Sequence, residues 1–247
     1  MSLKEKLKSL LFEKVKGWGG QTAYREPILR VASAGDPLWG KLKEVFPSHF
    51  MPWELLEGSR SIVVFFLPFS REIIESNQGG YYSSREWAIA YVETNALLYE
   101  ISKDMLNLLE EHGYKGVIVK PTHNFDEKEL LSRWSHRHVG YIAGMGTFGL
   151  NNMLITERGC GGRFNSFVTD APLEPDSRPL GEFCLFKRGG KCKACVERCP
   201  VGALRVDGFD RYICYKHCRE MDLYFGDLPK TDICGKCITY PCALGIP

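Results

Sequence analysis

Residues 192–200 read Cys192-Lys-Ala-Cys195-Val-Glu-Arg-Cys199-Pro200, and this short stretch decides the interpretation of the chain. It lies inside a dense group, because nine of the ten cysteines fall between Cys184 and Cys242. A disulfide framework of this density is a feature of exported proteins. The chain shows neither an apolar signal run nor a twin-arginine pair. The cysteines therefore indicate bound metal.

The spacing of these cysteines points to iron–sulfur clusters. Bacterial ferredoxins hold 4Fe–4S clusters with the run Cys-x-x-Cys-x-x-Cys-x-x-x-Cys-Pro, whose last cysteine binds the other cluster. Cys192, Cys195 and Cys199 are in register with the last three positions of that run. The first position falls on Gly189, and Cys184 replaces it if residues 185–190 form a loop. The sequence thus predicts a ferredoxin-like module that transfers electrons.

Two 4Fe–4S clusters need eight thiolates, and the crossing pattern of ferredoxins suggests how they divide. One cluster would take Cys184, Cys192, Cys195 and Cys242, and the other Cys199, Cys214, Cys234 and Cys237. Cys218 is either spare or a competitor of Cys214, and Cys160 lies outside the module. Cys-x-x-Cys pairs also build structural zinc sites. The Cys199-Pro200 turn followed by Val-Gly-Ala favours clusters over zinc.

Composition and charge exclude several other classes of protein. The 247 residues are 44% hydrophobic and 25% charged, which is ordinary for a globular protein. The net charge is +2, so no strong basic field indicates nucleic acid. The longest apolar run, residues 62–68, is far too short to span a bilayer. We therefore expect a cytoplasmic protein that does not enter a membrane.

The residues before the cysteines read as a mixed α/β domain. An amphipathic helix is expected from the first residues to about Gly17, and a long helix over 88–112 closed by Gly113. Further expected elements are strands at 61–68, 116–120, 152–156 and 164–169 and a second helix at about 126–138. Strand, long helix and strand make a crossover unit, so part of the sheet is expected to be parallel, with a mixed sheet left open. The proline-rich residues 170–179 lead into the cysteine module.

Several patches from about Pro52 onward resemble the catalytic core of the epoxyqueuosine reductases, which are relatives of the reductive dehalogenases. The patches are Leu55-Leu-Glu-Gly-Ser-Arg-Ser-Ile-Val-Val64, Tyr82-Ser-Ser-Arg-Glu-Trp87, Phe125-Asp126 with Leu131-Ser-Arg133, Gly144-Met-Gly-Thr-Phe-Gly-Leu-Asn-Asn-Met-Leu-Ile155, and Phe209-Asp-Arg-Tyr-Ile-Cys214. The last patch resembles the family's Leu-Asp-x-x-x-Cys and favours Cys214 over Cys218 as a ligand.

This resemblance implies an α+β protein with two parts. Residues 1–180 would form a nitroreductase-like α/β domain that binds cobalamin in its base-off form, and residues 181–247 a ferredoxin-like module with two 4Fe–4S clusters. The clusters would pass electrons to cobalamin, which would reduce a small-molecule substrate. The resemblance also allows a homodimer, and an upstream donor such as a ferredoxin or flavodoxin would supply the electrons.

The resemblance also assigns roles to single residues. Asp126 matches the family's proton donor, a role that suits a carboxyl kept protonated in an apolar cavity. Its alternative role is to cap the helix that follows. Gly144, Gly146 and Gly149 would let the backbone approach a flat corrin ring, or would serve packing alone. Asn151 and Asn152 would donate to corrin amides or to substrate, and Arg85 would hold an anionic group or form an exposed ion pair. His136 and His138 lie two residues apart on the expected helix, which disfavours a shared metal.

Departures from the family pattern weaken the expectation of a tRNA substrate. Leu150 stands where the family has lysine, Ser84 where it has glycine and Ala88 where it has histidine. The chain ends at Pro247, before the helical-repeat extension with which those enzymes grip tRNA. A small molecule is therefore favoured over tRNA. Two other functions stay open: an iron–sulfur electron carrier that reactivates a corrinoid protein, and a flavin-binding reductase on the same fold.

Overall fold

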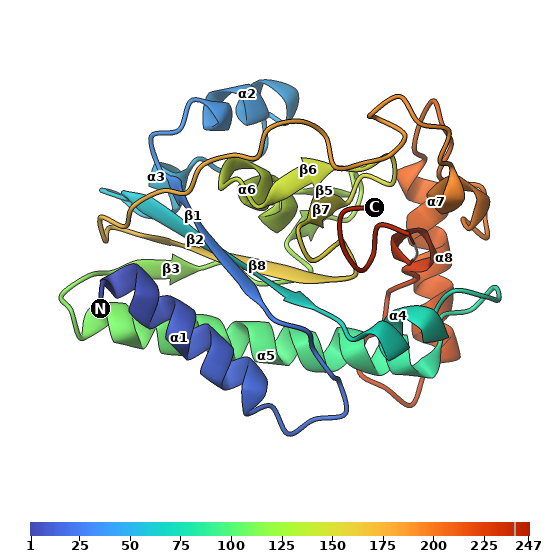
Figure 1. Ribbon diagram of the computed structural model, residues 1–247, viewed down its shortest axis with the longest axis horizontal. Coiled ribbons are helices and arrows are strands. Elements are labelled where there is room, and N and C mark those ends of the chain that lie inside the picture. The colour runs from blue at the N-terminus through green and yellow to red at the C-terminus, as the bar shows by residue number, and fades with distance from the viewer. Residues whose placement is uncertain (240) are drawn as a thin grey trace.

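The computed structural model describes residues 1–239 and 241–247 and contains one four-stranded sheet with helices on both faces (Figure 1). The strand order is β1-β2-β8-β3, formed by Ile28–Ser33, Ser61–Pro68, Gly162–Thr169 and Gly116–Ile118. Every neighbouring pair in this sheet is antiparallel. The expected parallel pairing is therefore wrong. Strands β2 and β3, which precede and follow the long helix in the chain, do run in the same direction. In the sheet, however, β8 lies between them and pairs antiparallel with both.

The apolar run that predicted a buried strand forms β2, and all eight of its residues are buried. Successive side chains of a strand point to opposite faces of a sheet. Ile62, Val64 and Phe66 accordingly join one hydrophobic core, while Val63, Phe65 and Leu67 join the other. Strand β2 is thus the shared centre of two cores, which is why its sequence shows no polar alternation.

Helices α1 (Leu3–Lys16) and α5 (Arg85–Glu110) cover the sheet face that carries Val63 and Phe65. Helix α1 begins at a capping box in which Ser2 and Glu5 bond each other's backbone N–H groups, and Gly17 ends it as expected. Helices α2 (Leu38–Val45), α3 (Pro52–Leu55) and α6 (His136–Ile142) lie on the opposite side in Figure 1. The sheet is thus the middle of three layers. No described helix is both long and apolar enough to cross a membrane.

Residues 124–133 form a β-hairpin, so the helix expected over 126–138 is wrong in its first half. Strands β4 (Phe125–Asp126) and β5 (Leu131–Ser132) pair antiparallel, and the turn between them places Leu130 at a φ of 53°. The Asp126 carboxylate accepts the backbone N–H groups of Lys128 and Glu129, which favours a turn over a continued helix. Helix α6 begins only at His136.

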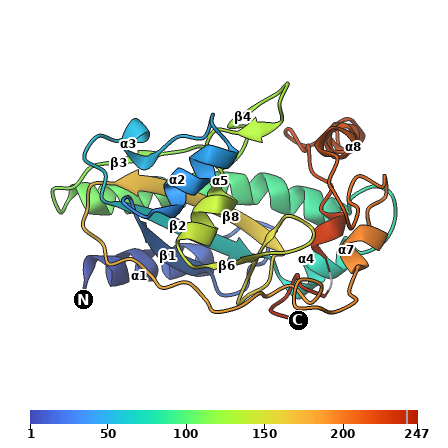
Figure 2. The same ribbon diagram turned by 90° about the horizontal axis from the view of Figure 1, so that it is seen from above.

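The cysteine-rich quarter packs against one end of the sheet and of α5 (Figure 2). Its regular elements are the short helices α7 (Ala194–Glu197) and η1 (Lys236–Ile238) and the longer α8 (Arg211–Tyr224). A third hydrophobic cluster joins this quarter to the α/β part through residues that include Trp87, Ile155, Cys184 and Ile238. Helix α4 (Arg71–Ser76) and the hairpin of β6 (Gly146–Phe148) and β7 (Leu154–Thr156) lie beside this contact.

Arg25 ties the C-terminal segment to the sheet. Its guanidinium donates to the carbonyl oxygens of Phe69, Arg158, Ala243 and Leu244, at 2.8–3.3 Å. These four acceptors come from three separate stretches of chain. The cysteine module is therefore held against the α/β part by a hydrogen-bonded anchor as well as by apolar contacts.

Candidate functional site

Four cysteines surround one small cavity at the end of the sheet. Cys184, Cys192, Cys195 and Cys242 line it together with Gly149, Leu150 and Asn151. Burial, followed by the nearby Cys242 and Cys184 sulfurs, raises the pKa of the Cys195 thiol to about 11. We call these four residues the first cysteine group. They are the same four that the sequence assigns to one cluster, brought together from positions 58 residues apart in the chain, 184 to 242.

The other four predicted ligands also lie near one another. Burial raises the pKa of Cys234 to about 11 and that of Cys237 well above its ordinary value, and sulfurs of Cys214 and Cys199 add to both shifts. We call Cys199, Cys214, Cys234 and Cys237 the second cysteine group. Cys195 also acts on Cys237, so the two groups adjoin.

Cys214 and Cys218 are the two candidates for one ligand position of the second group. Both lie on α8, four residues apart and hence on one face of the helix. The hydrogen bond between them, with burial, raises the pKa of Cys218 far above its ordinary value, and the thiolate that accepts this bond is that of Cys214. Cys214 is thus the more readily deprotonated of the two, in agreement with its expected role as ligand.

The loop that carries Cys234 and Cys237 is fixed by two close contacts. Gly235 has a φ of 72°, and a Cβ at this position would lie 2.3 Å from the Trp87 indole, so only glycine fits. The buried Lys236 ammonium donates to both oxygens of Asn77 and to the carbonyl oxygen of Gly79. Two cysteine side chains are thereby held on either side of an immobile turn.

The cysteine groups differ from a preformed site for a single metal ion. In a tetrahedral zinc site with Zn–S bonds of about 2.3 Å, neighbouring thiolates lie roughly 3.8 Å apart. Among residues 1–239 and 241–247, no three His, Cys, Asp or Glu side chains converge closely enough to hold one metal ion. Cys184, Cys192, Cys195 and Cys242 of the first group instead border one shared cavity.

Cys160 lies next to the first cysteine group without being one of its members. It is fully buried, and its Sγ is 3.7 Å from the Sγ of Cys242. The Asn151 amide Nδ2 lies 3.8 Å from the same Cys160 Sγ and donates to the carbonyl oxygen of Cys237 at 2.9 Å. Asn151 thus connects the two cysteine groups, and its amide is not free to meet a corrin ring as expected.

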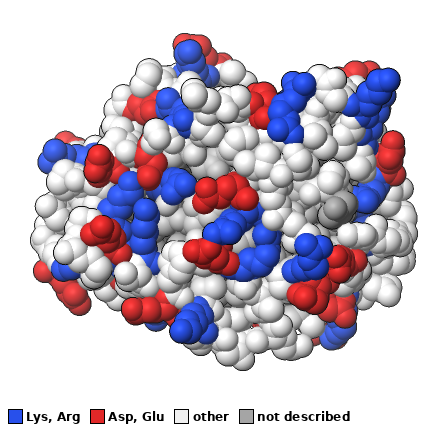
Figure 3. All heavy atoms as spheres, viewed as in Figure 1, with Lys and Arg blue, Asp and Glu red and all other residues white. Residues whose placement is uncertain are grey.

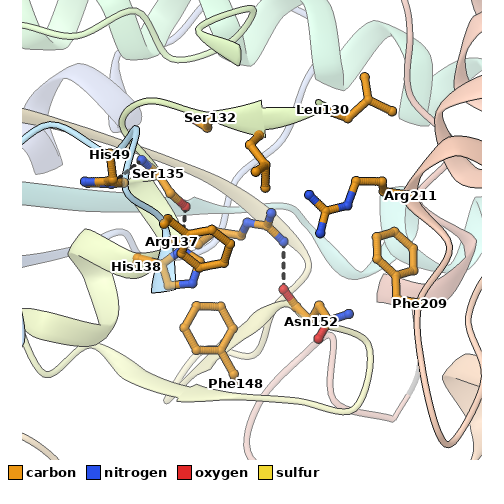
Figure 4. Close-up of a pocket in the computed structure, with 12 residues that line it drawn as sticks. His49, Leu130, Ser132, Ser135, Arg137, His138, Phe148, Asn152, Phe209 and Arg211 are labelled. Carbon is orange, nitrogen blue, oxygen red and sulfur yellow. Dashed lines mark hydrogen bonds between the residues drawn. The ribbon is translucent and has the colours of Figure 1, made fainter. Parts of the chain in front are cut away.

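Two adjoining cavities open on the other side of this loop. The first cavity, of about 380 Å³, has apolar walls that include Phe46, Phe148 and Phe209, and polar groups from Arg137, His138 and Asn152 (Figure 4). The second cavity, of about 340 Å³, is lined by residues of β8, α6 and the segment 121–125. Ser132, Ser135 and Arg137 border both cavities, so the two adjoin, and we call them together the recess.

Three histidines of this recess are held neutral by burial. The His136 side chain donates to the Lys120 carbonyl oxygen and bonds Ser166 Oγ, and burial lowers its pKa to about 4. Burial, with the nearby Arg137, lowers the pKa of His138 to about 4 as well. Burial also lowers the pKa of His49, whose Nε2 accepts the N–H of Ser135. The recess therefore gains no positive charge from these rings at neutral pH.

The chain was compared with family models and with the sequences of known proteins. No family model matches the chain. An epoxyqueuosine reductase of Bacillus anthracis is 26% identical over 166 residues, which are 64% of this chain and 39% of that protein. The Bacillus subtilis enzyme is 27% identical over 161 residues, 62% of this chain and 37% of that protein. The chain is similar in sequence to these epoxyqueuosine reductases. It spans about two fifths of the length of these curated relatives.

Solved structures show the same mixed α/β fold. The epoxyqueuosine reductase from Streptococcus thermophilus superposes with a TM-score of 0.62 at 17% identity, over 100% of this chain and 68% of that one. A catabolic reductive dehalogenase in complex with 3-bromo-4-hydroxybenzoic acid gives a TM-score of 0.50 at 21% identity, over 72% of this chain and 23% of that one. At these identities the likeness establishes the fold alone.

The glycines of the patch shared with epoxyqueuosine reductases serve internal packing. A Cβ on Gly144 would lie 2.2 Å from the carbonyl oxygen of Ser177, and one on Gly146 would lie 1.9 Å from that of Ile155. At Gly149 it would lie 2.6 Å from Asn151 Oδ1. These contacts agree with the alternative that the glycines serve packing, and their approach to a macrocycle stays a prediction. Asn152 is exposed at the first cavity, and its contact with a ligand stays a prediction.

Asp126 and Arg85 lie away from the recess. Asp126 is on β4 and is not among the described residues that line either cavity. The backbone N–H groups of Glu129 and Lys128 lower the pKa of its carboxyl, so the protonated acid in an apolar cavity is not found in this conformation. Arg85 forms an exposed ion pair with Asp227, which is one of the two roles that the sequence left open for it. Sequence reasoning missed Arg137 as a cavity residue, although it considered the histidines on either side.

Proposed function

We propose that the protein is an oxidoreductase in which two 4Fe–4S clusters deliver electrons to base-off cobalamin in the recess, where a small molecule is reduced. In this proposal residues 1–180 form a nitroreductase-like cobalamin-binding domain and residues 181–247 a ferredoxin-like module. Bound cobalamin would supply a cobalt centre that takes up electrons and reduces a substrate. The first and second cysteine groups would each hold one cluster.

One observation carries the proposal: a single loop separates the cysteines from the recess. Gly149, Leu150 and Asn151 border the cavity of the first cysteine group, while Asn152 and Met153 border the two larger cavities. Arg137, which lines both larger cavities, also interacts electrostatically with Cys237 and Cys214 of the second group. Electrons that leave the clusters would therefore reach a ligand in the recess across one layer of chain.

The recess offers the surfaces that a corrinoid needs. Two adjoining openings of about 380 and 340 Å³ make a broad recess instead of one closed pocket. Aromatic side chains at Phe46, Phe148 and Phe209 provide flat apolar walls. Ser135, Arg137 and Asn152 provide polar groups for the amides at the ring's edge. The aromatic and polar residues present thus fit the chemistry of the group.

Asp126 would act as proton donor after a movement of its hairpin. Leu130, Leu131 and Ser132 of the same hairpin already line the first cavity. The Phe125 and Tyr215 rings, 5.6 Å apart, hold the hairpin against α8. An epoxyqueuosine reductase structure from Bacillus subtilis has its catalytic loop swung out of the active site, with a TM-score of 0.58 to this chain. An inward swing would remove the two backbone hydrogen bonds that lower the pKa of Asp126 and would bury the carboxyl, and both changes raise that pKa.

A small-molecule substrate is favoured over tRNA by the charge of the chain. One epoxyqueuosine reductase structure contains a tRNA stem loop. This chain has a net charge of only +2, and Figure 3 shows acidic and basic side chains interspersed on the face drawn there. Phosphate backbones select extended basic surfaces. Electrons would come from an upstream carrier such as a ferredoxin or flavodoxin in the cytoplasm.

Anaerobic reconstitution with iron, sulfide and cobalamin tests the proposal. We expect the absorbance of iron–sulfur clusters together with that of bound base-off cobalamin, and a cobalt signal that reduction of the clusters diminishes. Asp126→Asn should lower substrate turnover without lowering cluster or cobalamin content, with the exposed Asp207→Asn as matched control. Intact clusters without cobalamin uptake would identify an electron carrier, flavin uptake a flavin reductase, and zinc in place of iron would contradict all three.

A further inference from the structure

The second cavity contains two guanidinium groups and no carboxylate among its described lining residues. Arg137 comes from α6 and Arg163 from β8, and the fold brings them to one space. Burial lowers the pKa of the Arg137 guanidinium, and the nearby positive charge of Arg163 lowers it further. Two like charges in a partly buried space are costly unless a ligand of opposite charge joins them.

The Arg163 guanidinium has no hydrogen bond or ion pair to any other described residue, and its Nε is buried. Its guanidinium lies over the ring of Tyr91, with 4.3 Å between the Cζ atom and the ring centroid. This stacking fixes the plane of the guanidinium and leaves its edge free to donate. Burial raises the pKa of Tyr91 to about 12, so the phenol stays neutral and does not compensate the charge of Arg163.

The nearest carboxylate is already engaged by other groups. Asp232 interacts electrostatically with Arg163 but forms no ion pair with it. Its oxygens accept the Tyr91 hydroxyl at 2.7 Å and contact His123 Nε2 at 3.0–3.1 Å, and Lys230 Nζ lies 3.7 Å away. The Asp232 carboxylate therefore binds Tyr91 and His123, and the N–H donors of Arg163 are available to a ligand.

Arg137 likewise has hydrogen-bond donors that contact no other described residue. Its Nη1 donates to the Asn152 carbonyl oxygen at 2.7 Å and lies 3.0 Å from the Met153 sulfur, while its remaining nitrogens bond no other described residue. These two contacts hold the guanidinium at the boundary of the two cavities. Figure 4 shows the contact with Asn152 at the first cavity. A third arginine, Arg211, faces the first cavity from the opposite wall.

We propose that the ligand of the second cavity carries a phosphate or carboxylate group that binds between Arg137 and Arg163. A planar guanidinium matches both groups with two parallel hydrogen bonds. The proposal rests on the proposed function only in taking the recess as the ligand site, and it adds the chemical class of the ligand. The group has two possible sources: a small anionic substrate, or the nucleotide phosphodiester of cobalamin itself.

A purely structural role for the two arginines makes a different prediction. An arginine that serves only packing would stabilise the fold and would not respond to anions. Arg163→Met keeps much of the apolar stem that covers Tyr91 and removes the donors, and Arg163→Lys keeps the charge without the fork. The exposed Arg85→Met is the matched control, because its guanidinium pairs with Asp227 outside the recess.

Isothermal titration calorimetry of the cluster-loaded full chain gives the first test, with sodium phosphate and sodium acetate as probes and sodium chloride at equal ionic strength as reference. We expect the wild type and Arg85→Met to bind a probe, and Arg163→Met and Arg137→Met to bind it at least about tenfold more weakly. Arg163→Lys should lose less than Arg163→Met. A probe concentration of about 10 mM is high enough to detect weak binding. If the wild type binds neither probe at this concentration, the result counts against a free anion as the source of the group.

Uptake of cobalamin and of cobinamide, which lacks the nucleotide phosphate, separates the two sources. If the phosphodiester is the ligand, the arginine variants weaken cobalamin uptake and leave cobinamide uptake unchanged. Free-anion binding that falls in the variants, with both uptakes intact, assigns the site to substrate. The proposal is overturned if neither free anions nor cobalamin distinguish Arg163→Met and Arg137→Met from Arg85→Met. Iron and sulfide contents, measured on the same samples, report separately on the proposed function.

Discussion

Replacement of Lys236 by methionine tests the turn that presents Cys234 and Cys237. The Lys236 side chain is 2% exposed, and its ammonium donates to Asn77 O at 3.2 Å, to Asn77 Oδ1 at 3.1 Å and to Gly79 O. Lys236→Met keeps a similar apolar length and removes all three bonds. Two oxygens of the buried Asn77 and the carbonyl oxygen of the exposed Gly79 are then left without this donor.

The expected cost follows from two opposing terms. Hydrogen bonds to a charged donor contribute about 1.5–3 kcal/mol each, and buried acceptors left without a donor add to the loss. Relief of the cost of burying an ammonium offsets part of it. We therefore expect the free energy of unfolding to fall by about 3 kcal/mol, and the iron bound by the second cysteine group to fall with it.

Guanidinium chloride titration, followed by tryptophan fluorescence and by cluster absorbance, measures both effects. Lys41→Met, at an exposed position, is the matched control and should leave the unfolding midpoint unchanged. An unfolding free energy for Lys236→Met within about 0.5 kcal/mol of the wild type, the usual range of surface substitutions, would refute the reasoning.

Three further outcomes are expected. Cys184→Ser should lower bound iron from about eight to about four per chain, one cluster's content, while Cys218→Ser should leave it unchanged in iron assays. His136 has its pKa lowered to about 4 by burial, against 6.5 when exposed, so only the unfolded state takes up its proton as the pH falls below 6.5. This group alone should cost about 2 kcal/mol of stability between pH 7.5 and pH 5, and His136→Gln should flatten the pH dependence of denaturant midpoints. Gly146→Ala would place a Cβ 1.9 Å from the Ile155 carbonyl oxygen and should abolish soluble expression, whereas Gly208→Ala, which meets nothing within 4 Å, should not.

Elements with strong local signals were predictable from the sequence. The uninterrupted apolar run at 61–68 forms β2, and helix α1 ends before Gly17 as expected. The cysteine spacing anticipated which four thiols would share the cavity at Cys184 and Cys242. These features depend on residue type and short spacing, which a sequence states directly.

The hairpin at 124–133 was not predictable from periodicity. A helix was expected over 126–138, but Trp134 enters the core and stacks on Trp39 with 5.4 Å between ring centroids. The Asp126 side chain meanwhile caps a turn. Tertiary packing of one tryptophan and one local hydrogen-bonded turn together outweigh helical propensity, which is a weak preference.

The close approach of two arginines in the recess was also not predictable from the sequence. Arg137 and Arg163 lie 26 positions apart, 137 to 163, and become neighbours only because α6 packs on β8. Arg85 looked equivalent in the sequence, but the fold places Asp227 beside it. Which arginine stays unpaired depends on where carboxylates lie in space, and no local pattern records that.

Iron and acid-labile sulfide content of the anaerobically prepared wild-type chain tests the central claim most directly. If the two cysteine groups each hold a 4Fe–4S cluster, the assay will find about eight iron and about eight sulfide ions per chain, four of each for one cluster. About four of each would leave one cysteine group without a cluster. Stoichiometric zinc with no sulfide would contradict the account, because the cysteines would then be structural and no electrons would reach the recess.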